Sequence, residues 1–427
     1  MKKFIKNFTE LATTKNRETV LSIAEAGFTS IDTEEVLLGA IKLNNNVLSV
    51  LGEDFDLSKF KRIKVVGFGK ASCEGALVLE KILGSKIKEG AVIGLQKVDC
   101  IYIETFSGTH PKPSQMNVDA GKKIYEIIKD SQEDDLIITL ISGGGSALLC
   151  YDQNECEQGI KLYDSFLKSG KTINEINTVR KHLSQLKGGG LAKVAYPATI
   201  ISLIFSDVPG DNFNDVASGP TYKDDTTITD AQNIIDRYNL GDFVLLETPK
   251  EDKYFEKVHN FVLISNKTAV EAMVKRAESL GLKTKIVSTE LYDEIGVAVD
   301  KIFSIQEENT VVLAAGEPSV IVKEGGGKGG RNLHMSLTAV RNKMIDRKNF
   351  QNSVFLSLAS DGMDNSDVAG ALVDKGILEN IQKLNLNVED YLERFDSYNF
   401  FQKAGGMIVT GPTGANVSDL MILLTKE

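Results

Sequence analysis

Three clusters of glycine residues in this sequence each carry a cation inside the cluster or beside it. They are VGFGK at 66–70, LKGGG at 186–190 and GGGKGGR at 325–331. Because glycine has no Cβ, successive backbone N–H groups in such a loop can turn toward an anion, and a nearby Lys or Arg adds positive charge. A phosphate group fits this combination of donors and charge. Phosphoryl transfer is therefore the first chemistry that these residues suggest.

A fourth glycine loop, SGGGS at 142–146, carries no cation and follows the apolar run 136–141. No Lys-Ser or Lys-Thr completes a Walker A loop, and no GxSxG elbow makes Ser146 a hydrolase nucleophile. A tight structural turn is the alternative interpretation. Three consecutive glycines have a high conformational-entropy cost, however, which favours a loop that contacts a ligand.

The cation of the first cluster is Lys70, which falls where a helix is expected to begin. The helix dipole and the ammonium group would both attract an anion there. A dinucleotide-binding fingerprint is broken in this cluster, because Ser72 occupies the position of its third glycine. An exposed lysine at an ordinary helix start is the alternative.

Two arginines are further candidates for anion binding. Arg331 closes the third cluster just before a helical stretch, where a guanidinium can orient phosphoryl oxygens bidentately. Arg180, Ser184 and Lys187 share one face of a helix that the spacing predicts over 173–186. That face could hold a carboxylate or a phosphate, although a solvated basic helix face is the alternative.

Two pairs of aspartates follow apolar runs that are typical of strands. Asp207 and Asp211 come after one run, and Asp361 and Asp364 come after another. Carboxylates at the carboxyl end of a strand can hold Mg²⁺ or accept the proton of a hydroxyl group. Ordinary turn chemistry is the alternative for both pairs.

The composition restricts the partners. With 49 Lys+Arg against 59 Asp+Glu, the net charge is −10, so no broad basic surface for nucleic acid is expected. We find no signal peptide and no membrane span in the sequence, and the four cysteines form no CxxC pair. The sequence therefore predicts a cytoplasmic protein with free thiols.

The alternation of predicted strands and helices along the chain is typical of an α/β protein, and we expect two domains. Residues 1–50 show helical spacing and are expected to pack on a later core, and a charged stretch near 238–257 resembles a domain junction. Short apolar runs followed by helical stretches are typical of a mostly parallel sheet. The predicted strands are 63–67, 91–95, 136–141 and 199–205 before the junction, and 261–264, 284–287, 310–314, 354–359 and 419–424 after it.

The chain resembles the class II glycerate 2-kinases, whose C-terminal part is known as the MOFRL region. The resemblance covers nearly all of the sequence beyond residue 60. It rests on VGFGKAS (66–72), GTHPKP (108–113), ISGGGSALL (141–149), EINTVRKHLSQLKGG (175–189), SDVPGD with ASGPT (206–221), GGGKGGRN (325–332), ASDGMD (359–364) and GANVSDL (414–420).

This resemblance implies transfer of the γ-phosphoryl group of ATP to the 2-hydroxyl of D-glycerate. We expect Mg²⁺ or another divalent cation to bind with the phosphates. The resemblance also implies a Rossmann-like larger domain, a smaller α/β domain and an active site between them. We place these domains at 1–240 and 241–427, with a last strand that could return to the first domain. Lys70 and Arg331 align with the two cations proposed to act in catalysis. Independently of the resemblance, we favour Asp207 as the base because it follows a predicted strand.

The other predicted site residues surround these three. Asp207, Asp361 and Asp364 are the predicted metal ligands. The predicted substrate- or nucleotide-binding residues are Gly69, Ser142, Gly143, Gly144, Gly145, Ser146, Asn177, Arg180, Lys187, Gly327, Lys328, Gly329 and Gly330.

Several positions depart from what similar sequences commonly carry. Ser114 stands in place of an Asp, Gly190 in place of an Arg, and Leu333-His334 in place of Gln-Glu. A related short hydroxy acid is therefore an alternative acceptor. A homo-oligomer is a further alternative for the assembly of the chain. The alternative functions are a nicotinamide-dependent hydroxypyruvate reductase and a non-catalytic sugar-phosphate sensor.

Overall fold

The computed structural model describes residues 2–167, 173–208, 213–321, 325–344 and 352–426. The chain folds into two compact units. One comprises Thr33–Leu263 and is called the parallel-sheet unit below. The other combines Met1–Asp32 with Ile264–Glu427 and is called the mixed-sheet unit.

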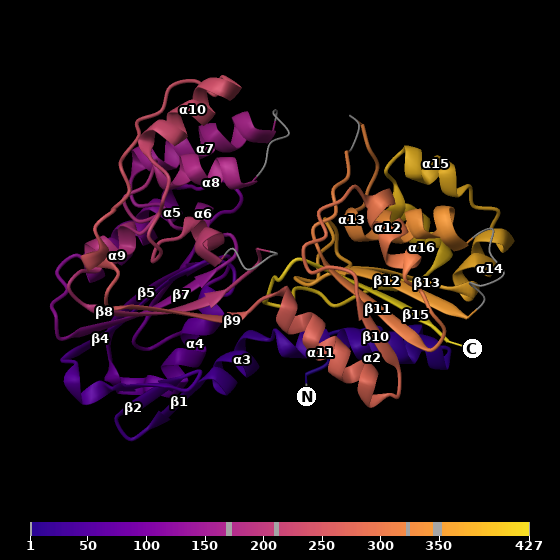
Figure 1. Ribbon diagram of the computed structural model, residues 1–427, viewed down its shortest axis with the longest axis horizontal. Coiled ribbons are helices and arrows are strands. Elements are labelled where there is room, and N and C mark those ends of the chain that lie inside the picture. Colours follow the sequence, from indigo (N-terminus) through magenta and orange to yellow (C-terminus); the bar gives the residue numbers. More distant parts are fainter. Residues whose placement is uncertain (1, 168–172, 209–212, 322–324, 345–351, 427) are drawn as a thin grey trace. The chain divides into compact units, whose positions relative to one another are not determined.

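The parallel-sheet unit is built on a sheet of six strands in the order β6-β5-β4-β7-β8-β9 (Figure 1). The four strand pairs from β6 to β8 are parallel. The strands are β4 (Arg62–Phe68), β5 (Ile87–Gly94), β6 (Glu104–Ser107), β7 (Asp135–Ser142), β8 (Thr199–Phe205) and β9 (Val258–Ile264). The expected mostly parallel sheet is therefore confirmed.

Helices cover both faces of this sheet because its strands are apolar on both sides. On one face, Leu140 of β7 lies against Gly75 of α4 (Ser72–Leu83), beside α3 (Thr33–Ala40). On the other, Ile137 and Ile141 share a core with Ile124 of α5 (Gln115–Ile128). Further helices are α6 (Gly145–Leu148), α7 (Gln153–Leu167), α8 (Ile173–Lys181), α9 (Gly190–Ala195) and α10 (Ile228–Tyr238).

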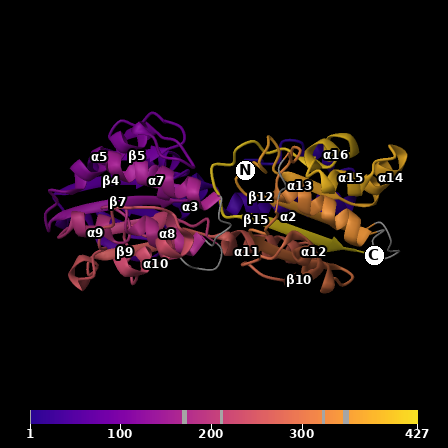
Figure 2. The ribbon, with the colours of Figure 1, turned by 90° about the horizontal axis from the view of Figure 1, so that it is seen from above.

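The mixed-sheet unit has six strands in the order β10-β11-β15-β12-β13-β14, and only β10 and β11 are a parallel pair. Helices α2 and α11 cover one face, and α12 to α16 cover the other (Figures 1 and 2). The strands are β10 (Lys283–Ile286), β11 (Thr310–Gly316), β12 (Ser353–Ala359), β13 (Gly370–Val373), β14 (Met407–Ile408) and β15 (Asp419–Thr425). The helices are α1 (Phe8–Leu11), α2 (Lys15–Ser30), α11 (Asn266–Ser279), α12 (Ile295–Ser304), α13 (Arg331–Ala339), α14 (Lys375–Lys383), α15 (Val388–Glu393) and α16 (Ser397–Ala404).

The domain division differs from the predicted 1–240 and 241–427. The N-terminal α2 packs along α11 in the mixed-sheet unit, where Arg17 donates to both carboxylate oxygens of Asp374 at 2.6 and 2.7 Å. β9 joins the parallel sheet instead of opening the second domain, and β15 pairs with β11 and β12 in its own sheet instead of returning. These pairings join residues far apart in sequence, which a local pattern does not reveal.

Two predicted helices are also corrected. Residues 41–50 form β1 (Ile41–Asn44) and β2 (Val47–Val50), which continue into β3 (Glu53–Asp56) as a small antiparallel sheet. Asn45 and Gly52 supply the positive φ angles of its turns, at 57° and 91°. The helix predicted over 173–186 ends at Lys181.

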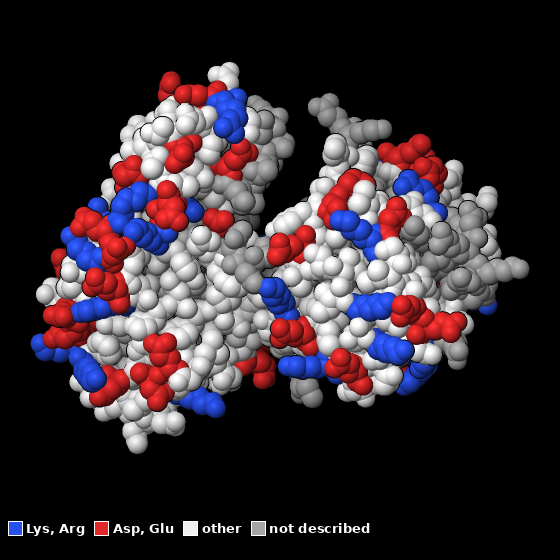
Figure 3. Space-filling model, in the orientation of Figure 1, with Lys and Arg blue, Asp and Glu red and all other residues white. Residues whose placement is uncertain are grey.

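Acidic and basic side chains are interspersed over the visible face of both units (Figure 3). Among the described residues, no helix combines the length and the apolar character that crossing a membrane would require.

Candidate active site

The first and fourth glycine loops lie together at the carboxyl ends of β4 and β7. The Lys70 N–H donates to Gly143 O at 2.9 Å, and the Ala71 N–H donates to Ser142 Oγ at 3.1 Å. A Cβ on Gly69, which has a φ of 122°, would overlap Ser142. The glycine is therefore needed for the close contact that holds Lys70 beside the 142–146 loop.

Three side chains gather around that loop. The Asp207 carboxylate lies directly against Gly143, where a Cβ would overlap it. At Gly144, whose φ is 78°, a Cβ would lie 3.1 Å from His110 Cδ2 and 3.3 Å from Lys70 Cγ. The structure thus brings Lys70 and Asp207 to the same loop, and it adds His110.

His110 is not among the site residues predicted from the sequence, although it stands in the GTHPKP motif just beyond β6. Its position after a strand of the same parallel sheet was the signal that could have found it. Burial lowers the pKa of His110 to about 4, and the positive charges of Lys70 and Arg180 act in the same direction. The imidazole is therefore neutral at pH 7.

Beside this cluster, α8 carries Arg180 and Asn177. Arg180 Nη1 donates to Asn177 Oδ1 at 3.4 Å, and Ser218 Oγ donates to the same oxygen at 3.4 Å. Ser146 Oγ lies 2.9 Å from Ser218 Oγ, which links the glycine loop to the helix. Burial lowers the pKa of Arg180 to about 10.

The second glycine cluster has a structural role. The N–H groups of Gly188 and Gly189 donate to Ser218 O at 2.9 Å and Gly219 O at 2.8 Å, so these two donors are already used. Lys187 is buried, donates to Leu149 O at 2.7 Å and forms an ion pair with Glu155. The common helix face predicted for Arg180, Ser184 and Lys187 does not exist, because α8 ends at Lys181.

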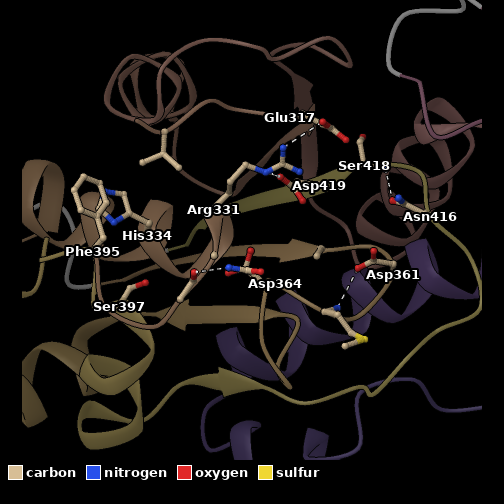
Figure 4. Close-up of a pocket in the computed structure, with 17 residues that line it drawn as sticks. Glu317, Arg331, His334, Asp361, Asp364, Phe395, Ser397, Asn416, Ser418 and Asp419 are labelled. Carbon is tan, nitrogen blue, oxygen red and sulfur yellow. Dashed lines mark hydrogen bonds and ion pairs between the residues drawn. The ribbon is translucent and has the colours of Figure 1, made fainter. Parts of the chain in front are cut away.

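The mixed-sheet unit holds a pocket of about 380 Å³ around the third glycine cluster (Figure 4). Arg331, the first residue of α13, extends between Glu317 and Asp419. Its Nη1 lies 3.2 Å from Glu317 Oε2, and its Nε lies 3.1 Å from Asp419 Oδ2. The other residues that line the pocket include Gly327, Gly329, Gly330, His334, Asp361, Asp364, Phe395, Ser397, Asn416 and Ser418.

Carboxylates dominate the electrostatics of this pocket. Burial raises the pKa of Asp419 to about 7, although Arg331 acts in the opposite direction. Burial also lowers the pKa of Arg331, but Asp419 and Glu317 more than offset it, so its pKa is raised. Arg331 is thus a cation held in place by two acidic groups.

The N-terminus of α13 is already occupied by a side chain of the protein. Asp364 accepts the N–H groups of Asn332 and Leu333 at 2.9 and 2.8 Å, and a Cβ on Gly330 would overlap this carboxylate. Asp364 therefore caps this helix with both of its oxygens, and its role as a metal ligand stays a prediction.

The rest of the glycine cluster packs against the start of α16. Lys328 Nζ lies 3.4 Å from the centre of the Tyr398 ring and 3.5 Å from Asp367. A Cβ on Gly329 would overlap Ser397 Oγ, and one on Gly327 would lie 2.6 Å from Asp396 Cβ. The close packing of this loop accounts for these glycines without any ligand.

Within the described ranges, no group of three or more His, Cys, Asp or Glu side chains is arranged to hold a metal ion. Magnesium needs only one or two protein carboxylates when phosphates supply its other ligands. Asp361, which lines the pocket, and Asp207 fit that requirement. Asp211 lies outside the described residues.

Comparisons with known proteins place these features in a family. A model described as a domain of unknown function (DUF4147) matches residues 19–246, and the MOFRL family model matches 310–419. A glycerate 2-kinase from Pyrococcus horikoshii is 35% identical over 96% of this chain and 98% of its own length.

A crystal structure of glycerate kinase from Thermotoga maritima has a TM-score of 0.82 and 29% identity, and the match covers 96% of this chain and 99% of that one. An Agrobacterium vitis relative, 34% identical over 85% of this chain and 87% of its own length, carries the provisional name of a hydroxypyruvate reductase.

Proposed function

Because the chain belongs to the glycerate 2-kinase family, we propose that it transfers the γ-phosphoryl group of ATP to the 2-hydroxyl of D-glycerate, yielding 2-phospho-D-glycerate and ADP. The observation that carries the proposal is the gathering of Lys70, His110 and Asp207 around the 142–146 loop. This gathering supports the proposal because a cation, a neutral imidazole and a carboxylate lie around a single short loop.

In the proposed reaction, the O2 atom of glycerate forms a bond to the γ-phosphorus, and the bond from that phosphorus to the β–γ bridging oxygen breaks. Asp207 takes the hydroxyl proton, and the ammonium of Lys70 stabilises the charge on the transferred group. Catalysis of this reaction depends mainly on positioning and on charge stabilisation, because its transition state is loose. Lys70 is suited to that role since its backbone is locked to Gly143.

Arg331 is proposed as the second cation on the transferred phosphoryl group. Its two acidic partners orient the guanidinium before substrate arrives. Magnesium, which would neutralise phosphate charge when bound, would be held by Asp207 or Asp361 together with the phosphates. The four cysteines are free thiols, which fits the cytoplasmic location that we also propose.

The test is an assay of ATP turnover with short hydroxy acids, in which the product is identified by ³¹P and ¹H NMR. We expect turnover that requires D-glycerate and yields the 2-phosphate. A 3-phosphate product would overturn the proposed regiochemistry, and binding of sugar phosphates without any turnover would indicate a sensor.

The reductase alternative rests on the name of the Agrobacterium relative. Ser72 at the position of the third glycine argues against a nicotinamide cofactor in this chain. We expect no loss of NADH absorbance when the protein is mixed with NADH and hydroxypyruvate, whereas catalytic oxidation of NADH would support the reductase.

A further inference from the structure

Arg180 differs from the other buried or half-buried arginines of the described residues in having no acidic partner. Arg17 pairs with Asp374, Arg62 pairs with Asp135, and Arg331 pairs with Asp419. Within the described ranges, the side chain of Arg180 forms a single hydrogen bond, at 3.4 Å to the neutral amide of Asn177. We infer that Arg180 binds the carboxylate of the hydroxy-acid acceptor, an inference that rests on the proposed function.

The energetics of burial support this assignment. A guanidinium that leaves water without a counter-charge loses hydration that one weak hydrogen bond does not replace, and burial accordingly lowers the pKa of Arg180 to about 10. Its planar group can donate in parallel to both oxygens of a carboxylate. An anionic ligand would therefore supply the counter-charge that the described residues do not provide.

The space beside Arg180 has the size of a carboxylate group. Arg180, Ser146 and Pro111 line a pocket of about 30 Å³, which is roughly the space of two water molecules. Glu155 also lines it, but the ion pair with Lys187 neutralises that carboxylate. The pocket can thus take the charged end of an acid without repulsion from Glu155.

The position of the pocket selects acids whose hydroxyl is close to the carboxylate. Lys70 lies against Gly144. Ser146, which is two residues after Gly144 in the chain, lines the pocket beside Arg180. Two residues span at most about 7 Å. The charges of Lys70 and Arg180 both lower the pKa of His110, so both cations lie near this imidazole. A 2-hydroxy acid can present its carboxylate to one and its hydroxyl to the other.

The experiment compares D-glycerate with D-glyceramide, its neutral amide, in the wild type and in Arg180→Gln. Without its charge partner, the variant should lose about 10²-fold in kcat/KM for glycerate and less than threefold for glyceramide. Arg237→Gln is the matched control, because Arg237 is exposed in the same unit and should leave both values unchanged. An equal loss with both substrates would show a structural role, and no loss would also overturn the inference.

A binding measurement separates this inference from the proposed function. Thermal unfolding is followed with D-glycerate and with D-lactate, in the absence of ATP, for the wild type and for Arg180→Gln. Stabilisation by these acids that requires Arg180 supports the carboxylate site even if no glycerate is phosphorylated. Equal stabilisation of both proteins overturns the site, even if the wild type is an active glycerate kinase.

Discussion

Arg180 in the parallel-sheet unit and Arg331 in the mixed-sheet unit are both expected to meet an anion, yet their surroundings are opposite. Arg331 is held between two acidic side chains at 3.1 and 3.2 Å, whereas the described residues offer Arg180 an amide oxygen at 3.4 Å and no carboxylate. A cation that is already paired keeps its orientation and can stabilise charge that develops during a reaction. A cation without a counter-charge gains most from a ligand that is charged from the start.

Among the variants that test this comparison, substitution of Arg331 should have the largest effect on the rate of phosphoryl transfer. We expect Arg331→Gln to lower kcat by roughly 10³-fold with little change in the KM for ATP, because its charge would act on the transition state. Steady-state kinetics with saturating glycerate measure this effect. Arg276→Gln, an exposed helix position in the same unit, is the control. A kcat that stayed at the wild-type value in a folded variant would remove Arg331 from the mechanism.

Lys70→Gln is expected to lower kcat by about 10²-fold, since a single ammonium orients phosphate less strictly than a guanidinium does. Lys81→Gln, on the exposed face of α4, the helix that follows Lys70, should have no effect. If Lys70 and Arg331 act on one phosphoryl group, the double variant will lose less than the product of the two single losses. If the loss in kcat of the double variant equals the product of the two single losses, Lys70 and Arg331 contribute independently to catalysis.

Protonation of Asp419 should make the free energy of unfolding depend on pH. The folded state keeps this proton up to a pKa of about 7, while the unfolded chain releases it near pH 4. This group therefore lowers the free energy of unfolding as pH rises from about 4 to 7, by up to about 1.4 kcal/mol per pH unit. Asp419→Asn should remove that slope in urea titrations at pH 5, 6 and 7. Parallel pH profiles of the two proteins would contradict the raised pKa.

The smallest expected effect is the change in the free energy of unfolding when Arg331 or Arg180 is substituted. Arg331→Gln leaves two acidic side chains without their cation and should lower the free energy of unfolding by about 1 kcal/mol, a modest value because Arg331 is 38% exposed. Arg180→Gln removes a charge that has no acidic partner in the described part of the chain, and should leave stability unchanged or raise it. Thermal unfolding without ligands measures both. A clear loss of stability in Arg180→Gln would mean that the folded protein already pairs this charge.

Much of the local structure could be predicted from the sequence. The apolar runs near 63–67, 136–141 and 199–205 form β4, β7 and β8, because strands buried on both faces are continuously apolar. The placement of Lys70 before a helix is confirmed by α4. The helical prediction was wrong for 41–50 and for 182–186, the end of the helix predicted over 173–186, because turn residues and tertiary packing decided those segments.

The sequence by itself determined which residue types stand at the ends of the strands, since these follow from local hydrophobic patterns and glycine positions. Only the tertiary structure decided what each one touches. It turned Asp364 into a helix cap, used the N–H groups of 188–189 for structure and brought His110 to Gly144. It also gave Arg331 acidic partners 14 and 88 residues away, and among the described residues it gave Arg180 no acidic partner. The pairing of charges depends on distances in space, and the folding of the whole chain sets those distances.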